Sequence, residues 1–136
     1  MRSRTSKTKH SRENVAETVA RISGITYIQI PSDDPAKSAA FYHAAFGWQI
    51  RGGPEHQSFS DGTGHVIGAW VTDIPIAGEA GVLPYIYVAS VDDSLNAITK
   101  HSGQVLKAPY PEGNLWVATF RDPAGNVIGL WQDTPR

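Results

Sequence analysis

The hydrophobic residues of the run 24–30 (GITYIQI) are β-branched and aromatic and are interspersed with polar ones, a pattern typical of a β-strand. The Asp33-Asp34-Pro35 run that follows supplies an N-cap and a first-turn proline. It predicts a helix over 35–46 that ends at Gly47. Three more strands are expected at 48–52, 56–60 and 65–72, with a tight turn at 61–64. The first half of the chain therefore predicts the order βαβββ.

The same order is expected again after a Pro/Gly/Ala-rich connector at 73–83. A strand at 84–89 leads into a helix, capped by Asp92 or Asp93 and ended by Gly103. Strands are then expected at 104–107, 115–121 and 126–132, with a turn at 122–125 between the last two.

Sequence identity supports this duplication. Residues 59–70 (FSDGTGHVIGAW) match residues 120–131 (FRDPAGNVIGLW) at seven of twelve positions, with an offset of 61 and no gap. A fixed internal period of this kind indicates one structural unit used twice. We expect an α+β domain at 23–136, with module one at about 24–72, a linker at 73–83 and module two at about 84–132. A helix covers only one face of each module's sheet, so two modules together are expected to form an open, barrel-like cleft.

Charge is distributed unevenly along the chain. Residues 1–21 hold six Lys/Arg against two Glu, whereas the remainder holds six Lys/Arg against eleven Asp/Glu. Residues 1–22 are expected to be a basic leader that is disordered or partly helical. The leader lacks interleaved aromatic residues, so no nucleic-acid partner is expected, and no apolar run is long enough for a membrane span. The absence of cysteine excludes thiolate chemistry and is compatible with a cytoplasmic protein.

Three segments resemble the vicinal oxygen chelate superfamily, which includes glyoxalase, bleomycin-resistance and extradiol dioxygenase proteins. They are DDPAKSAAFYHAAFGW at 33–48, the strand and capped helix at 85–103, and FRDPAGNVIGLW at 120–131. The resemblance covers nearly all of the globular part. It implies the glyoxalase/bleomycin resistance fold of paired βαβββ modules, and often a homodimer.

Enzymes of that superfamily usually hold a divalent metal through four His, Glu or Gln side chains, one from each of four strands. Transferred by resemblance, these positions fall at Tyr27 or Gln29, at Gly68, at Ile86 or a neighbouring tyrosine, and at Gly129. Glycine and isoleucine supply no ligand atom, and a Lewis-acid site needs three or four. The resemblance therefore predicts a member without the metal site and without another cofactor.

The two-residue period places Gly68 with Trp70, and Gly129 with Trp131. If the glycines face the cleft, both indoles line it too and offer stacking and cation–π contacts to a planar or cationic organic molecule. The alternative is that both tryptophans belong to the core or to a dimer interface. The candidate ligand-binding residues are Tyr27, Gln29, Gly68, Trp70, Tyr85, Tyr87, Gly129 and Trp131.

The preferred hypothesis is a small-molecule-binding protein, without a metal, that acts as a homodimer. One alternative is a metal-dependent glyoxalase-like lyase or a dioxygenase with a relocated metal site, so enzymatic activity stays open. Another is an interaction module that uses the basic leader.

Overall fold

The computed structural model describes residues 21–76, 78–133 and 135–136. Predictions for residues 1–20, including most of the basic leader, lie outside the described residues. The first module contains β1 (Tyr27–Pro31), α2 (Pro35–Phe46), β2 (Gln49–Arg51), β3 (Ser58–Ser60) and β4 (Ile67–Val71). The second contains β5 (Tyr85–Tyr87), α3 (Val91–Lys100), β6 (Gln104–Glu112), β7 (Leu115–Arg121) and β8 (Val127–Gln132). The predicted order βαβββ, linker, βαβββ is confirmed.

Both helices begin at capping side chains. The Lys37 amide donates to Asp34 Oδ1 at 3.2 Å, and α2 ends at Gly47 with a left-handed φ of 73°, as the sequence predicts. The prediction for α3 is wrong in detail, because Ser90 caps it and accepts from the Asp93 amide at 3.1 Å. Asp92 and Asp93 instead lie in its first turn, where a carboxylate stabilises the positive end of the helix dipole.

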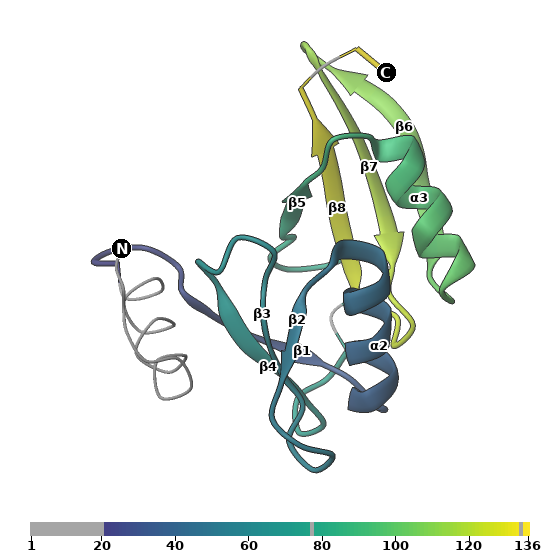
Figure 1. Ribbon diagram of the computed structural model, residues 1–136. Coiled ribbons are helices and arrows are strands. Elements are labelled where there is room, and N and C mark those ends of the chain that lie inside the picture. The colour runs from purple at the N-terminus through teal and green to yellow at the C-terminus, as the bar shows by residue number, and fades with distance from the viewer. Residues whose placement is uncertain (1–20, 77, 134) are drawn as a thin grey trace.

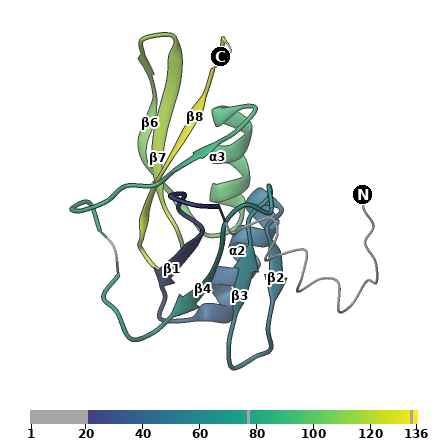
Figure 2. The same ribbon diagram turned by 90° about the vertical axis from the view of Figure 1, so that its left-hand side faces the viewer.

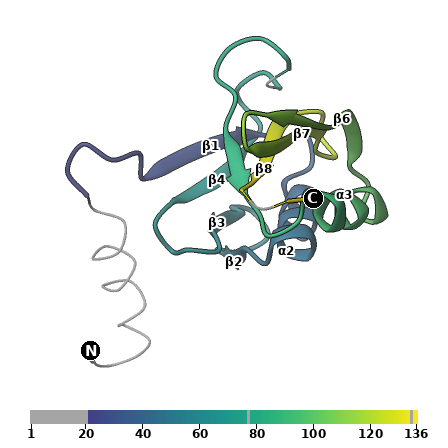
Figure 3. The same cartoon turned by 90° about the horizontal axis from the view of Figure 1, so that it is seen from above.

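Each module forms its own four-stranded sheet. Sheet A has the strand order β1-β4-β3-β2, and sheet B has the order β5-β8-β7-β6. Figures 1 and 2 show both helices on one side of the molecule, α2 against sheet A and α3 against sheet B. Seen from above in Figure 3, sheet B curves and does not close onto sheet A. We call the side of each sheet that packs against its helix the helix-facing side, and the opposite side the open face.

One hydrophobic core joins the two modules. It holds Phe41 and Tyr42 from α2, Ile98 from α3, and Phe120 and Leu130 from sheet B, all at most 2% exposed. Polar contacts cross the same boundary, since the Tyr42 hydroxyl donates to Asp122 Oδ2 at 2.8 Å. Asn126 Nδ2 donates to that carboxylate at 2.9 Å and to the Pro31 carbonyl at 2.7 Å. The Asp-Pro-Ala-Gly-Asn turn therefore connects module two to both α2 and β1.

The two copies of the repeated sequence differ in register. In module one the hairpin closes through Asp61 N–H to the Val66 carbonyl, whereas in module two it closes through Asp122 N–H to the Asn126 carbonyl. The first turn thus contains one more residue than the second. Phe59 pairs with Gly68, but Phe120 pairs with Ile128 rather than Gly129. The gapless alignment is therefore wrong beyond the turns, and Ala69 is the structural counterpart of Gly129.

Strand β6 is longer than predicted. The sequence predicts a strand over 104–107, but β6 continues to Glu112 through Pro109 and Pro111. Strand β6 lies at the edge of sheet B, where a residue without an N–H need not break a ladder. Two shifts of register interrupt its pairing with β7, between Val105 and Lys107 and between Lys107 and Tyr110.

Candidate functional site

The register places Gly68 and Trp70 on the helix-facing side of sheet A. Gly68 pairs with Ile28 and Trp70 with Ile30, and paired residues of a ladder share a face. The Trp70 ring centroid lies 4.7 Å from that of Phe59 and 5.7 Å from that of Tyr42, and Trp70 is 3% exposed. The prediction that Trp70 and Gly68 line the cleft beside Tyr27 and Gln29 is therefore wrong in geometry. A one-residue difference in register turns every side chain of a strand to the other face.

In sheet B the other predicted residues do share the open face. Tyr85 pairs with Gly129 and Tyr87 with Trp131, and the helix-facing positions beside them are held by Ile86 and Leu130. Tyr85 is 44% and Tyr87 56% exposed. The Tyr87 and Trp131 ring centroids are 4.5 Å apart. Four of the eight candidate residues therefore come together on one accessible surface.

Tyr27 and Gln29 lie on the open face of sheet A, opposite to Trp70. Tyr27 is 52% exposed and Gln29 is also exposed. Gln29 pairs with Ala69 in the way that Tyr85 pairs with Gly129 in the other module.

Two further residues of interest lie on the open face of sheet B. Tyr110 pairs with Val117, which pairs with Trp131, and Thr119 pairs with Gly129. We call Tyr85, Tyr87, Tyr110 and Trp131 the aromatic face. Sequence reasoning missed Tyr110 because the predicted strand stopped at residue 107, before the prolines. The position of Thr119 could have been predicted from the sequence, because the two-residue period of β7 places Thr119 on the same face as Val117.

Polar neighbours perturb the tyrosines of this surface. Burial of its hydroxyl, the nearby Tyr110 and Glu112, and a side-chain hydrogen bond with Tyr110 together raise the pKa of Tyr85. The pKa of Tyr87 is raised mainly by its hydrogen bond to Asp133, which its hydroxyl reaches at 3.1 Å. A tyrosine is neutral at physiological pH even at its ordinary pKa of about 10, and the raised pKa values move ionisation further away, so both residues present hydroxyl groups as donors and acceptors.

The residues at the expected metal positions do not fit a metal ion. On the open faces these positions hold Gln29 with Ala69, and Tyr85 with Gly129. Alanine and glycine offer no ligand atom, and the set contains neither imidazole nor carboxylate. In the described parts of the chain, no three His, Asp or Glu side chains lie close enough together to hold a metal ion.

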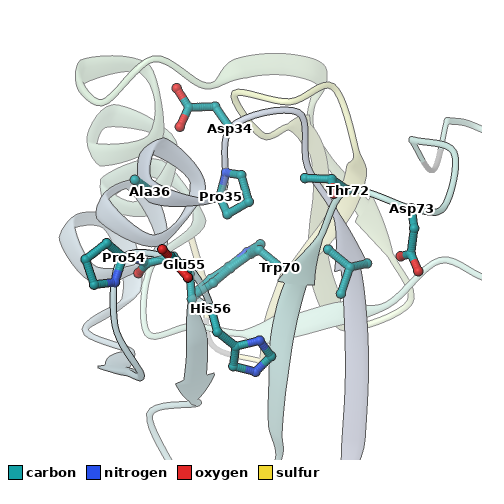
Figure 4. A pocket seen from close by; sticks show the side chains of 11 residues that line it. Asp34, Pro35, Ala36, Pro54, Glu55, His56, Trp70, Thr72 and Asp73 are labelled. Carbon is teal, nitrogen blue, oxygen red and sulfur yellow. The ribbon is translucent and has the colours of Figure 1, made fainter.

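Two pockets lie near the site, one that reaches Tyr85 of the aromatic face and one that lies away from it. One, of about 160 Å³, is found where the modules meet and is largely apolar. Its lining includes Ile28, Trp48 and Asp61 from module one, and Tyr85, Ile86 and Ile128 from module two. The other, of about 360 Å³, lies beside the first turn of α2. Figure 4 shows Trp70 crossing it below Pro35, with the polar side chains Asp34, Glu55, His56 and Asp73 around it.

Two βαβββ modules, each with a helix on one side of its sheet and the other side open, define the vicinal oxygen chelate type of fold. The chain belongs to the Glyoxalase/Bleomycin resistance protein/Dioxygenase superfamily, whose family model matches residues 24–130. No curated protein matches the sequence. No helix among the described residues has the length and apolar content needed to cross a membrane.

Solved structures of the same fold include members with different roles. A glyoxalase/bleomycin resistance protein/dioxygenase family enzyme from Burkholderia phytofirmans PsJN is 20% identical, with a TM-score of 0.68 over 79% of this chain and 97% of its own. The antibiotic-binding protein TnmS3 from Streptomyces sp. CB03234 is 23% identical, with a TM-score of 0.66 over 83% and 98%. The fosfomycin resistance protein FosX from Listeria monocytogenes is 18% identical, with a TM-score of 0.69 over 84% and 96%. At these identities the likeness shows the fold.

Proposed function

We propose that this protein binds a small organic molecule on the aromatic face of sheet B and does so without a metal ion. The observation that carries the proposal is the gathering of Tyr85, Tyr87 and Trp131 on one open face, with both tyrosines about half exposed. Aromatic rings left accessible to solvent offer stacking surface and apolar contact to a ligand. The antibiotic-binding activity of TnmS3, a protein of the same fold, supports a binding role.

The test is the affinity of the purified protein for a panel of planar aromatic compounds, measured by calorimetry. Trp131→Ala is expected to weaken binding of any compound found by about tenfold or more, an effect typical of an aromatic anchor. Trp116→Ala is the matched control, because Trp116 pairs with Gln132 and lies on the helix-facing side of the same sheet. Equal loss in both variants, or no loss in either, contradicts the proposed site.

Elemental analysis of protein purified without a histidine tag tests the metal-free part of the proposal. A stoichiometric divalent metal would contradict it and favour the alternative, a lyase or dioxygenase with a relocated metal site. The donor set of the open faces supports the proposal, because Gln29, Ala69, Tyr85 and Gly129 together lack imidazole and carboxylate.

We further propose that two copies of the chain associate through the edges formed by β1 and β5. Both are edge strands, and apolar side chains near them are exposed, with Ile25 at 79%, Tyr27 at 52% and Val82 at 92%. Exposed edges and apolar patches are characteristic of association surfaces. Light scattering is expected to give the mass of a dimer, and Tyr27→Glu to lower it toward that of a monomer. A natural protein with the mass of a monomer would contradict the proposed association.

A cytoplasmic location of the protein stays a prediction.

A further inference from the structure

The ring of Tyr85 lies flat on the backbone of Gly129. A methyl group built on Gly129 would overlap three carbons of that ring, Cδ2, Cε2 and Cγ, the last at 2.8 Å. The contact is therefore possible only because residue 129 has no side chain. Glycine within a strand often marks such a close approach of another group.

The corresponding positions of module one differ in both members of this pair. There Ala69 replaces glycine and its partner in the ladder is Gln29 rather than tyrosine. The methyl group of Ala69 occupies the space in which a ring would lie. The flat tyrosine is thus a property of module two and not a requirement of the fold.

Thr119 of β7 continues the row that Tyr85 and Gly129 form across sheet B. Thr119 pairs with Gly129 on the side away from Tyr85, so all three share the open face. Thr119 is 5% exposed, and its Oγ1 has no hydrogen-bond partner within the part of the chain that the structure describes. A buried hydroxyl without a partner is unfavourable and is satisfied when a polar group reaches it.

Little holds the ring in place from outside. Tyr85 is 44% exposed and lies on an edge strand, and Tyr110 and Glu112 are the polar side chains that act on its hydroxyl. A side chain that is partly exposed to solvent and lies at the edge of a sheet can rotate to another rotamer at modest cost. Rotation would uncover the backbone of Gly129, with the hydroxyl groups of Thr119 and Tyr110 at the same place.

We propose that the tyrosine ring fills a slot over Gly129 that a planar, hydroxyl-bearing aromatic group of the ligand enters when Tyr85 rotates away. The slot has a flat glycine floor that accepts a ring, and hydroxyl groups on Thr119 and Tyr110 that accept and donate hydrogen bonds. The ligand class is a phenol, because the Tyr85 ring shows that a phenol ring fits over Gly129, and a ligand hydroxyl would satisfy Thr119 Oγ1, which Tyr85 leaves without a partner among the described residues. This inference rests on the proposed binding function and specifies its ligand.

The probe is p-cresol, the isolated side chain of tyrosine, followed by NMR through the amide signals of Gly129 and Thr119. Tyr85→Ala empties the slot and is expected to bind p-cresol at least about tenfold more tightly than the natural protein, as engineered apolar cavities bind matching rings. Tyr87→Ala is the matched control, since Tyr87 is two residues along the same strand, on the same face and 56% exposed. Equal binding of p-cresol by the two variants overturns the slot.

Two more measurements test the hydroxyl groups and the rotation. Toluene, which lacks the hydroxyl, is expected to bind Tyr85→Ala more weakly than p-cresol, and equal binding overturns the phenol assignment. Tyr85→Phe loses the hydroxyl and its interaction with Tyr110, so its open fraction and its affinity for p-cresol are expected to rise about two- to tenfold. Unchanged or lower affinity means that Tyr85 does not close the slot.

These outcomes are separate from failure of the proposed function. If Trp131→Ala leaves binding of the aromatic panel unchanged, the aromatic face is not the ligand site, whatever p-cresol does in Tyr85→Ala. If Trp131→Ala weakens binding but Tyr85→Ala gains no affinity for p-cresol, the face binds ligand without the slot.

Discussion

Replacing Tyr42 by phenylalanine tests the contact that joins the two modules. Tyr42 is fully buried, and its hydroxyl donates to Asp122 Oδ2 at 2.8 Å. Removing a hydrogen bond to a charged group costs about 1.5–3 kcal/mol. Asp122 Oδ2 keeps its bond from Asn126 Nδ2 at 2.9 Å, so the carboxylate is not left unpaired. We therefore expect the lower half of that range, about 1.5–2 kcal/mol.

The assay is urea unfolding followed by circular dichroism, with the slope of the transition compared between variants. Tyr27→Phe is the control. Tyr27 is 52% exposed, so its change is expected to stay within about 0.5 kcal/mol. A double-mutant cycle with Asp122→Ala is expected to give a coupling of about 1 kcal/mol or more. A loss below about 0.5 kcal/mol in Tyr42→Phe, or a coupling near zero, refutes the view that this bond holds the modules together.

Three more predictions concern single positions. Gly68→Ala is expected to lower the free energy of unfolding by more than about 2 kcal/mol, because its methyl group would overlap the Phe59 ring and the Ile28 carbonyl. Gly129→Ala need only displace the exposed Tyr85 ring and is expected to cost under about 1 kcal/mol. Comparable losses for the two variants in urea unfolding would contradict this reasoning. Ser90→Ala is expected to cost about 1 kcal/mol as a lost N-cap, and an unchanged melting temperature would be contrary. Burial and the neighbouring Asp122 raise the pKa of Tyr42 above its ordinary value of 10 in the folded protein. Above about pH 10 the Tyr42 hydroxyl therefore ionises in the unfolded chain but not in the folded one. The free energy of unfolding is expected to fall there by up to about 1.4 kcal/mol per pH unit. Tyr42→Phe is expected to flatten this decline, and an identical decline in both proteins would be contrary.

Most of the fold is predictable from local signals. The helix over 35–46 follows from Asp34, Pro35 and Gly47, and its observed bounds agree with the prediction. Strand β7 also agrees at both ends. These signals are reliable because capping and alternation act within a few residues of one another, where the sequence states them directly.

The candidate site is half predictable. The two-residue period correctly groups Gly129 with Trp131, and Tyr85 with Tyr87, and the structure places all four on one face. The sequence does not reveal that the matching pair in module one, Gly68 and Trp70, lies on the helix-facing side of its sheet and not on the open face. In both turns the aspartate Oδ1 accepts from the amides two and three residues further on. In the second turn Asp122 Oδ1 also accepts from the Asn126 amide, four residues on, whereas in the first Asp61 Oδ1 accepts from the Val66 amide, five residues on. Two turns with similar residues can thus close at different lengths.

The extra residue in the first turn has a consequence for how duplicated proteins diverge. Both copies retain Val-Ile-Gly-x-Trp, yet Trp70 is enclosed by the core while Trp131 is turned outward. A shift of one residue in the position at which a hairpin closes is enough to exchange the interior and exterior of the strand that follows, with no residue inserted and no letter of the strand altered. After gene duplication, one copy can in this way keep the packing role of a motif while the other acquires a recognition surface from the same letters.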